Sequence, residues 1–366
     1  MCVWEDAFTA PLQPLYVSFV LHRMLLRLSR VVFVLLVGHA STSSLLSHHQ
    51  CHRHAMELRN QGFTVIQSAG LHAGSLIPNA RVSCSQEFAG LQNSVANVGL
   101  DPIEDKYAFA EIATRHRLRW GFQPLEPSAW TQLLDEAVVA ATPVIEELHR
   151  LPPHPDDMAR PLPQLTSWLR HLFPSTPSVV HVDAIVSTLG AKAQNFHPDA
   201  GDTHIKNARL NPRHRLFNVF CPLVDLAEDG DGTQFWPRSH HRPALERYAA
   251  AIERSGRLED DQTLMAEMVT PECPAGGILL FDFRVLHRGM PNTSGERPIA
   301  HAVLSTGHAS DPLDFPAASL KDAVTAVTQL SDDGHDVTHD ATVILRERIA
   351  QQQRDAWALV RNSSYR

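Results

Sequence analysis

The sequence predicts an α+β protein whose β part is a sandwich or a small barrel. Apolar residues recur at helical spacing through much of the region 104–173. From residue 178 to 306, short runs rich in β-branched and aromatic residues alternate with turn signals. Helices that precede a series of strands are typical of α+β domains. With 43% hydrophobic and 20% charged residues, the 366-residue chain can form a sizeable core.

The first 50 residues differ in composition from the rest. No Asp or Glu occurs between residues 7 and 56, and arginines precede an apolar run over residues 31–37. This order is typical of a secretory signal, and the acid-free composition also fits an organelle transit peptide. We expect residues 1–50 to be a targeting or disordered leader, with a membrane anchor as a further alternative. If residues 24–40 act as a targeting signal, the protein enters the secretory pathway or an organelle; otherwise it is cytoplasmic.

The folded domain is expected to span residues 53–366, and it opens with a short helix and a strand. The helix covers residues 55–60 and the strand residues 62–66. Helical support follows within residues 104–173, as three predicted helices: around 104–116, from the N-cap Ser128 with a kink or break at Pro143, and over 164–173. Histidines 48, 49, 52 and 54 fall at the end of the leader, and we expect them to be unstructured.

The core of the domain is expected at residues 178–306, where most of the strands fall. Predicted strands cover residues 179–188, 191–196, 216–223, 266–270, 278–281 and 299–305. A helix over residues 243–255 is inserted between them. A C-terminal helix over residues 340–361 has an apolar face that we expect to pack on the sheet.

Charge and cysteine content exclude several classes of protein. A formal net charge of −8 without a sustained basic tract argues against nucleic acid as the main partner. Five scattered cysteines form neither a disulfide framework nor a CxxC zinc site. The apolar run in the leader is too short for a stable membrane span in the mature protein. The 22 histidines are the unusual feature, and they suggest a metal.

Three His-x-Asp motifs could supply part of a two-histidine, one-carboxylate metal site. Chance alone gives about 1.4 such matches in a chain of this composition. His154 precedes Asp156 in a Pro-rich loop, where a helix N-cap explains the aspartate. His181 and Asp183 share one face of a predicted strand and remain an alternative. His197 and Asp199 follow a strand at the start of a Gly/Asp-rich loop, the usual place for an open metal site.

The second histidine of such a site is expected to be His287, which follows a turn and strand. Arg297 lies ten residues further on, across a turn at residues 292–295, so a hairpin would return it beside His287 on the neighbouring strand. A guanidinium there suits a carboxylate, such as the far end of 2-oxoglutarate. An ordinary charge at a strand edge is the alternative. His301 and His308 compete as the distal ligand but have no arginine at the same spacing.

Five segments together resemble the phytanoyl-CoA dioxygenase family of Fe(II)/2-oxoglutarate oxygenases. Residues 194–199 are similar to its Gln-x-x-His-x-Asp signature, and residues 232–240 to its Gly-Thr-x-x-x-Pro-Gly-Ser-His segment. Residues 277–282 and 287–297 resemble the distal half, and residues 62–66 the opening strand. The chain departs from the family in three places. Arg238 stands where Gly is usual, an insertion-prone region of 90 residues separates His197 from His287, and the Ser two residues after the family's arginine is missing.

The resemblance implies a double-stranded β-helix core (jelly-roll, cupin-like) with flanking helices, in a single catalytic domain. It implies that His197, Asp199 and His287 bind Fe(II) and that Arg297 binds 2-oxoglutarate, with O₂ as the other co-substrate. The expected reaction hydroxylates a C–H bond of a small organic or lipid-like metabolite and releases succinate and CO₂. A non-catalytic ligand-binding jelly-roll protein is the alternative. The primary substrate and the oligomeric state are not indicated.

Several other residues are candidates for supporting roles. Gln194 and Asn218 are placed to reach the co-substrate, with cross-strand hydrogen bonding as the alternative. Trp236 either lines the pocket or packs in the core. A basic loop just past the metal motif is either a lid, a clamp for an acidic substrate or a solvated loop; its charged residues are His204, Lys206, Arg209 and Arg213.

Overall fold

A computed structural model describes residues 46–67, 76–152, 154, 176–199, 215–227, 232–306 and 319–325. The chain divides into two compact units, Met1–Ser44 and Leu45–Arg366, and all described residues belong to the second. The leader over residues 1–44, the predicted helices over 164–173 and 340–361, the basic loop and His308 lie outside the described residues. None of the helices that the structure describes is both long and apolar enough to cross a membrane.

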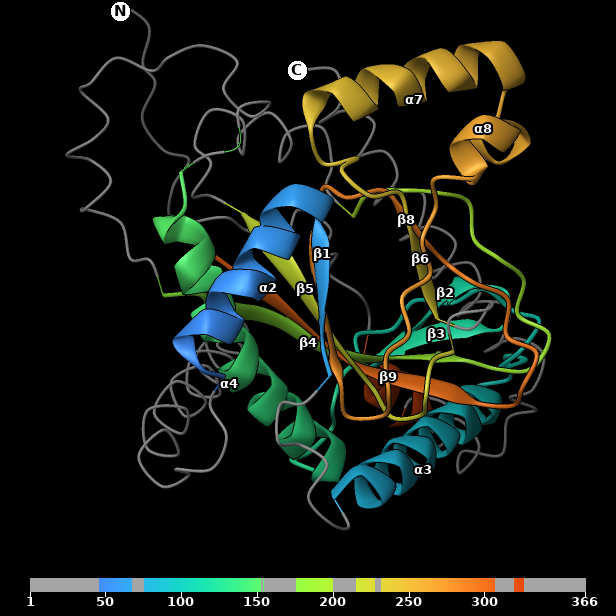
Figure 1. The fold of residues 1–366 in the computed structure, drawn as a ribbon. Coiled ribbons are helices and arrows are strands. Elements are labelled where there is room, and N and C mark those ends of the chain that lie inside the picture. The colour runs from blue at the N-terminus through green and yellow to red at the C-terminus, as the bar shows by residue number, and fades with distance from the viewer. Residues whose placement is uncertain are drawn as a thin grey trace, which may run out of the picture. The chain divides into compact units, whose positions relative to one another are not determined.

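A large antiparallel sheet forms the centre of the described unit (Figure 1). Its seven strands lie in the order β1-β7-β5-β9-β4-β3-β2. Their bounds are β1 Phe63–Ile66, β2 Ile112–His116, β3 Arg119–Phe122, β4 Ser178–Ser187, β5 Leu216–Pro222, β7 Ile278–Asp282 and β9 Arg297–Ser305. The central strands β5, β7 and β9 are buried along their whole length, including polar residues such as Asn218 and His301.

A second, two-stranded sheet pairs β6 (Thr233–Phe235) with β8 (His287–Gly289). Aromatic rings join the two sheets: Phe235 of β6 stacks on Phe63 of β1 at 4.5 Å between ring centroids and meets Phe281 of β7 edge-on at 5.2 Å. Two sheets in contact through an apolar layer agree with the α+β class and with the predicted sandwich.

Three helices pack against the large sheet in one continuous apolar cluster (Figure 1). They are α2 (His48–Gln61), α3 (Leu76–Asn97) and α4 (Ala129–Arg150). The helix α7 (Arg242–Ser255) lies between β6 and β7 in the chain, as predicted, and the short helices η2 (Leu258–Asp260) and α8 (Gln262–Met265) follow it. Cys51, Cys84, Cys221 and Cys273 are buried without disulfide bonds.

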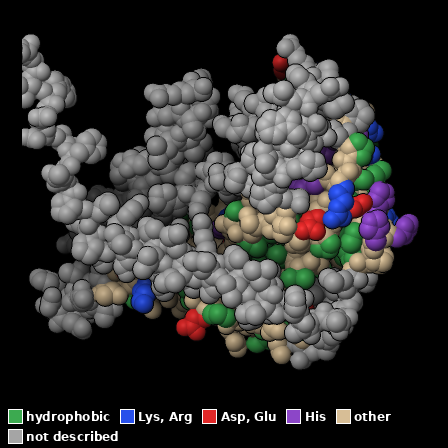
Figure 2. All heavy atoms as spheres, turned by 90° about the vertical axis from the view of Figure 1, so that its left-hand side faces the viewer, with side chains coloured by type: hydrophobic (Ala, Val, Ile, Leu, Met, Phe, Trp, Pro, Cys, Tyr) green, Lys and Arg blue, Asp and Glu red, His purple; other side chains and the backbone are tan. Residues whose placement is uncertain are grey.

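The N-terminal boundary of the folded unit differs from the prediction. Residues 48–54, expected to be unstructured, form the first turns of α2, which begins after the N-cap Ser47. Ser47 and Gln50 make a reciprocal capping box, a signal that the sequence contained. His48, His49 and His52 are exposed on this helix, whereas His54 is buried. Figure 2 shows exposed histidine side chains at one edge of the face that it draws.

The helices of the structure differ from the prediction in three places. The predicted helix over 104–116 is wrong: β2 and β3 form a hairpin there, because β3 pairs with β4 at the edge of the large sheet. The helix α3 was not predicted, since small residues such as Ala80 and Cys84 form part of its buried face. Pro143 does not break α4, which continues to Arg150 with its apolar face in the core.

The loops around β6 and β8 also differ from the prediction. Residues 191–196 and 266–270 are not strands, although single-residue bridges link His197 to His287 and Val269 to Phe235. The three-residue strands β6 and β8 were not predicted as strands. Arg238, where the family has Gly, takes a left-handed conformation with φ 69°, which explains why glycine suits this exposed position.

Candidate metal centre

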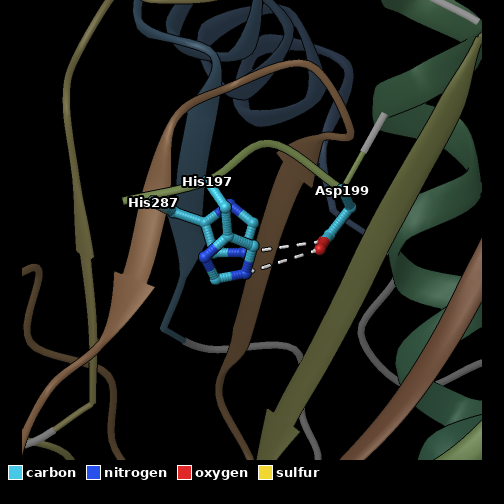
Figure 3. A group of neighbouring side chains, drawn as sticks. All are labelled: His197, Asp199 and His287. Atoms are coloured by element: carbon cyan, nitrogen blue, oxygen red, sulfur yellow. Dashed lines mark ion pairs between the residues drawn. The ribbon is translucent and has the colours of Figure 1, made fainter. Parts of the chain in front are cut away.

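His197, Asp199 and His287 converge at the end of the small sheet (Figure 3). One ligand atom from each lies within 4.8 Å of the others, and the structure brings no other such group of three together among the described residues. The Nε2 atom of His197 lies 3.9 Å from Oδ1 of Asp199, and that of His287 lies 3.5 Å from Oδ2. The other two His-x-Asp motifs supply no member of this group.

The backbone sets this arrangement through a bridge between two distant segments. The amides of His197 and His287 each donate to the carbonyl of the other, at 3.0 Å, so both imidazoles lie on the same side. The amide of Asp199 donates to the carbonyl of Phe283 at 3.0 Å, in the turn that precedes β8. A loop that follows β4 is thus held against β8.

Hydrogen bonds fix which nitrogen of each imidazole faces the centre. Nδ1 of His197 lies 2.8 Å from the carbonyl of Asn195, and Nδ1 of His287 lies 3.1 Å from that of Val285. Each Nδ1–H therefore donates to a backbone carbonyl, and each Nε2 presents a lone pair toward Asp199. Histidine ligands of metals are commonly held in this way.

Electrostatics favour the protonation states that a metal requires. Burial lowers the pKa of His287 and thus favours its neutral form, and nearby His197 acts in the same direction. Burial opposes ionisation of Asp199, but His287, His197 and the amide of Asn218 outweigh it and hold the pKa of Asp199 below its usual value. A neutral imidazole and a carboxylate are the ligating forms of these residues.

The three residues open into a cavity of about 200 Å³ that lies between the two sheets. Gln194, Asn218, Arg297 and His301 line it, together with Arg115, Arg119 and His181. The remaining wall is largely apolar; it includes Ile185, Phe220, Phe283, Ile299 and Val303. Among the described residues that line the cavity, Asp199 is the one acidic residue, so this part of the wall is rich in positive charge.

Arg297 reaches this cavity by a different route from the one predicted. It does not lie on a strand next to β8, because β8 pairs with β6 while β9 belongs to the large sheet, where Arg297 pairs with Ser187 of β4. The guanidinium crosses between the sheets and donates to the carbonyls of Met290 (2.9 Å) and Pro291 (3.2 Å). The ten residues from His287 to Arg297 thus connect the small sheet to the large sheet and do not form a hairpin.

The other candidate residues fall into two groups. Gln194 lines the cavity and accepts from the amide of Gly289 at 2.9 Å, whereas Asn218 donates to Asp199 at 2.7 Å. Trp236 is buried in a separate apolar cluster and does not line the cavity. Ser239 accepts from the amide of Leu286 at 2.7 Å, a structural contact next to β8.

Sequence reasoning missed Arg119, which lies on β3 and is almost completely buried. Its guanidinium donates to the carbonyl of Met290, as that of Arg297 does, and to the carbonyl of Lys192. Burial, with a further contribution from Arg297, lowers the pKa of Arg119 to about 10. Two cationic groups that share one acceptor at a cavity wall form a site for an anion. The sequence signal that could have indicated Arg119 is a basic residue in an otherwise apolar strand.

Asp183 belongs to a motif that was considered as an alternative metal site, but it lies in a separate cluster with Arg115, His181 and His301. Its buried carboxylate binds Arg115, lies 2.6 Å from Nδ1 of His301 and 3.3 Å from Nε2 of His181. Burial opposes its ionisation, but Arg115 and His301 outweigh it and hold the pKa of Asp183 well below its usual value.

Comparison with known proteins found similar solved structures and one family. Solved structures that match it include the non-heme α-ketoglutarate-dependent epimerase SnoN from nogalamycin biosynthesis (13% identity over 70% of this chain and 83% of that one, TM-score 0.41). AviO1 from Streptomyces viridochromogenes Tue57 matches at 14% identity, over 74% of this chain and 99% of that one, with a TM-score of 0.43. The model of the phytanoyl-CoA dioxygenase (PhyH) family matches residues 105–299, more than half of the chain, which includes the whole metal centre described above. The chain therefore belongs to the phytanoyl-CoA dioxygenase family.

Proposed function

We propose that the protein is an Fe(II)- and 2-oxoglutarate-dependent oxygenase with a jelly-roll core, which hydroxylates a C–H bond of a small organic or lipid-like metabolite. The observation that carries this proposal is the convergence of two imidazole Nε2 atoms and one carboxylate at the end of a cavity that is also lined by Arg119 and Arg297. Two histidines and one carboxylate on one side of a metal, with open positions opposite, are typical of non-heme Fe(II) oxygenases.

The donor set fits such a metal. Both histidines are oriented with Nε2 toward the centre by backbone carbonyls, and Asn218 holds one oxygen of Asp199. No thiol lies in the group, which argues against a structural zinc site of the cysteine-rich type. When bound, iron supplies the oxidation of the C–H bond with O₂ and 2-oxoglutarate.

The chain's own residues bind and orient the two organic reactants. Arg297 and Arg119 are placed to bind the distal carboxylate of 2-oxoglutarate, because both guanidiniums meet at the carbonyl of Met290. The apolar wall, with Ile185, Phe220 and Ile299, suits the hydrocarbon part of a substrate and excludes water from the reacting bond. Succinate and CO₂ are the expected co-products.

Anaerobic titration with Fe(II) and 2-oxoglutarate tests the proposal. We expect a weak visible charge-transfer band in the wild-type protein and its loss in His197→Ala. The matched control is His116→Ala, which removes an exposed histidine on β2 and is expected to keep the band. A metal-loaded, folded protein without the band would favour the alternative, a non-catalytic ligand-binding jelly-roll protein. Release of succinate with metabolite extracts then identifies the substrate class.

A further inference from the structure

A chain of hydrogen bonds runs from Asp199 into the large sheet. Nδ2 of Asn218 on β5 donates to Oδ2 of Asp199 at 2.7 Å, and Oδ1 of Asn218 lies 2.8 Å from Nε2 of His301 on β9. Nδ1 of His301 lies 2.6 Å from Oδ1 of Asp183 on β4. Asn218, His301 and Asp183 are all more than nine-tenths buried, on three neighbouring strands.

The direction of these bonds follows from the carboxylate of Asp199. A carboxylate only accepts hydrogen bonds, so Asn218 must face Asp199 with its amino group and turn its carbonyl away. That carbonyl then needs a donor, which is Nε2–H of His301. Without this donor, the buried carbonyl of Asn218 would be left unsatisfied, and the amide would be held in place by Asp199 alone. Asn218 would then give the carboxylate weaker support.

Asp183 fixes the ring of His301 in turn. Residue 183 of β4 lies directly opposite residue 301 of β9 in the ladder, and both strands are internal to the sheet. The carboxylate of Asp183 also binds Arg115 and approaches His181, so it is anchored from the other side. A group held by rigid strands can orient a ligand more closely than one on a loop.

We propose that His301 is a positioning residue for the metal: it holds the Asn218 amide in place through the amide's carbonyl, and the amide in turn holds the carboxylate of Asp199 toward the metal. This inference rests on the proposed function, because it needs a metal at Asp199. In this inference, Asn218 supports the proposed metal ligand Asp199 rather than binding the co-substrate. His301 thus acts two hydrogen bonds away from the metal, although it also lines the cavity.

Two substitutions of His301 separate its two hydrogen bonds. The side chain of Gln places an amide nitrogen near the position of Nε2, so His301→Gln keeps a donor for Asn218. The side chain of Asn reaches only as far as Nδ1, so His301→Asn keeps the contact with Asp183 and loses that with Asn218. The affinity of the metal-free, full-length chain for Co(II) is measured by calorimetry and by the visible Co(II) spectrum. Thermal unfolding of each variant monitors the fold.

We expect His301→Asn to weaken Co(II) binding by about 10–100-fold and His301→Gln by less than about threefold. The control His116→Gln alters an exposed histidine on β2 outside the cavity lining and is expected to change the affinity by less than about twofold. Asn218→Ala is expected to weaken binding as His301→Asn does. Adding His301→Asn to Asn218→Ala should then have less than about a twofold further effect, because both act through one route.

Four results would overturn the inference. Equal affinities of His301→Asn and the wild type would show that the amide of Asn218 needs no fixing. Equal weakening by Asn and Gln, or additive effects with Asn218→Ala, would indicate a general structural role for His301. If His197→Ala binds Co(II) as tightly as the wild type, the metal site itself is wrong, and the proposed function fails with it. If His301→Asn does not fold, Asn218→Ala and His301→Gln still test the same route.

Discussion

The buried pair Arg119 and Arg297 shows how single residues shape the candidate site. Both guanidiniums donate to the carbonyl of Met290, and Nε of Arg119 has no hydrogen-bond partner among the described residues. Gly289 allows this approach, because a Cβ there would lie 2.9 Å from Nη1 of Arg119. Like charges so close together in a buried place are stabilised by an anion between them.

We therefore expect Arg119→Met to raise the KM for 2-oxoglutarate. A hydrogen bond to a charged group contributes about 1.5–3 kcal/mol, which corresponds to roughly a 10–150-fold increase in KM. Co(II) affinity should change by less than about threefold, because Arg119 contacts none of the three proposed ligands. The control Arg117→Met lies in the same hairpin, pairs with exposed Glu104, and should leave the KM unchanged. An unchanged KM in Arg119→Met would exclude a role for this arginine in co-substrate binding.

At the scale of elements, the junction between α2 and β1 is fitted closely to the metal centre. Gly62 ends α2 in the left-handed conformation, with φ 89°. A Cβ at this position would lie 2.7 Å from Nδ1 of His240 and 2.9 Å from Cγ2 of Val285. The carbonyl of Val285 holds Nδ1 of His287. The end of a helix thus packs on the turn that orients a proposed metal ligand.

Gly62→Ala is expected to destabilise the protein by about 2–5 kcal/mol. The left-handed backbone accounts for about 1–2 kcal/mol, and the clash with His240 and Val285 adds about 1–3 kcal/mol. Gly256→Ala is the matched control: Gly256 ends α7 with φ 77°, but a Cβ there meets nothing within 4 Å. Chemical denaturation should show a loss of only about 1–2 kcal/mol for Gly256→Ala. Equal losses in both variants would show that the close approach at Gly62 is unimportant.

The elements that the sequence predicted well are those with strong local patterns. The core strands β4, β5, β7 and β9 follow from their β-branched runs, and α7 from its amphipathic pattern after the turn at residue 241. The strand β2 was predicted as helix because the hairpin that it forms with β3 is held by the pairing of β3 with β4, which is a long-range contact. The strands β6 and β8 are three residues long, too short for a periodic signal.

The candidate site was predictable to the extent that its residues are close in sequence. His197 and Asp199 belong to one short motif, and His287 follows a recognisable strand, so the sequence predicted the group that the structure brings together. Arg119 and the contact between Asp183 and His301 depend on the order of strands in the sheet. No spacing along the chain encodes that order, so these residues were not predicted in their observed roles.

At the scale of the whole molecule, stability is expected to fall as the pH decreases below about 6.5. Burial, aided by Arg53, lowers the pKa of His54 despite the opposing Glu57, so the unfolded chain binds a proton that the folded protein does not. This contribution is fully present above the ordinary histidine pKa of about 6.5. It is lost as the pH decreases toward the pKa of the folded state. Unfolding free energies measured between pH 7.5 and 5 should decline less steeply in His54→Gln than in the wild type, and identical slopes would contradict this.

Metal binding is expected to stabilise the whole described unit, because the site joins segments that are far apart in the chain. The loop with His197 and Asp199 follows β4, whereas His287 begins β8. An isolated bridge joins His287 to His197 of this loop. A ligand that binds only the folded state stabilises it by about 2.7 kcal/mol at a hundred times its Kd. Thermal unfolding with Co(II) at this concentration should thus raise the Tm by a few °C in the wild type. The variant His287→Ala should show no increase in Tm, because the two remaining ligands are too few to hold the metal at this concentration. An equal increase in both proteins would place the metal elsewhere on the chain, for which the exposed histidines of α2 are the first candidates.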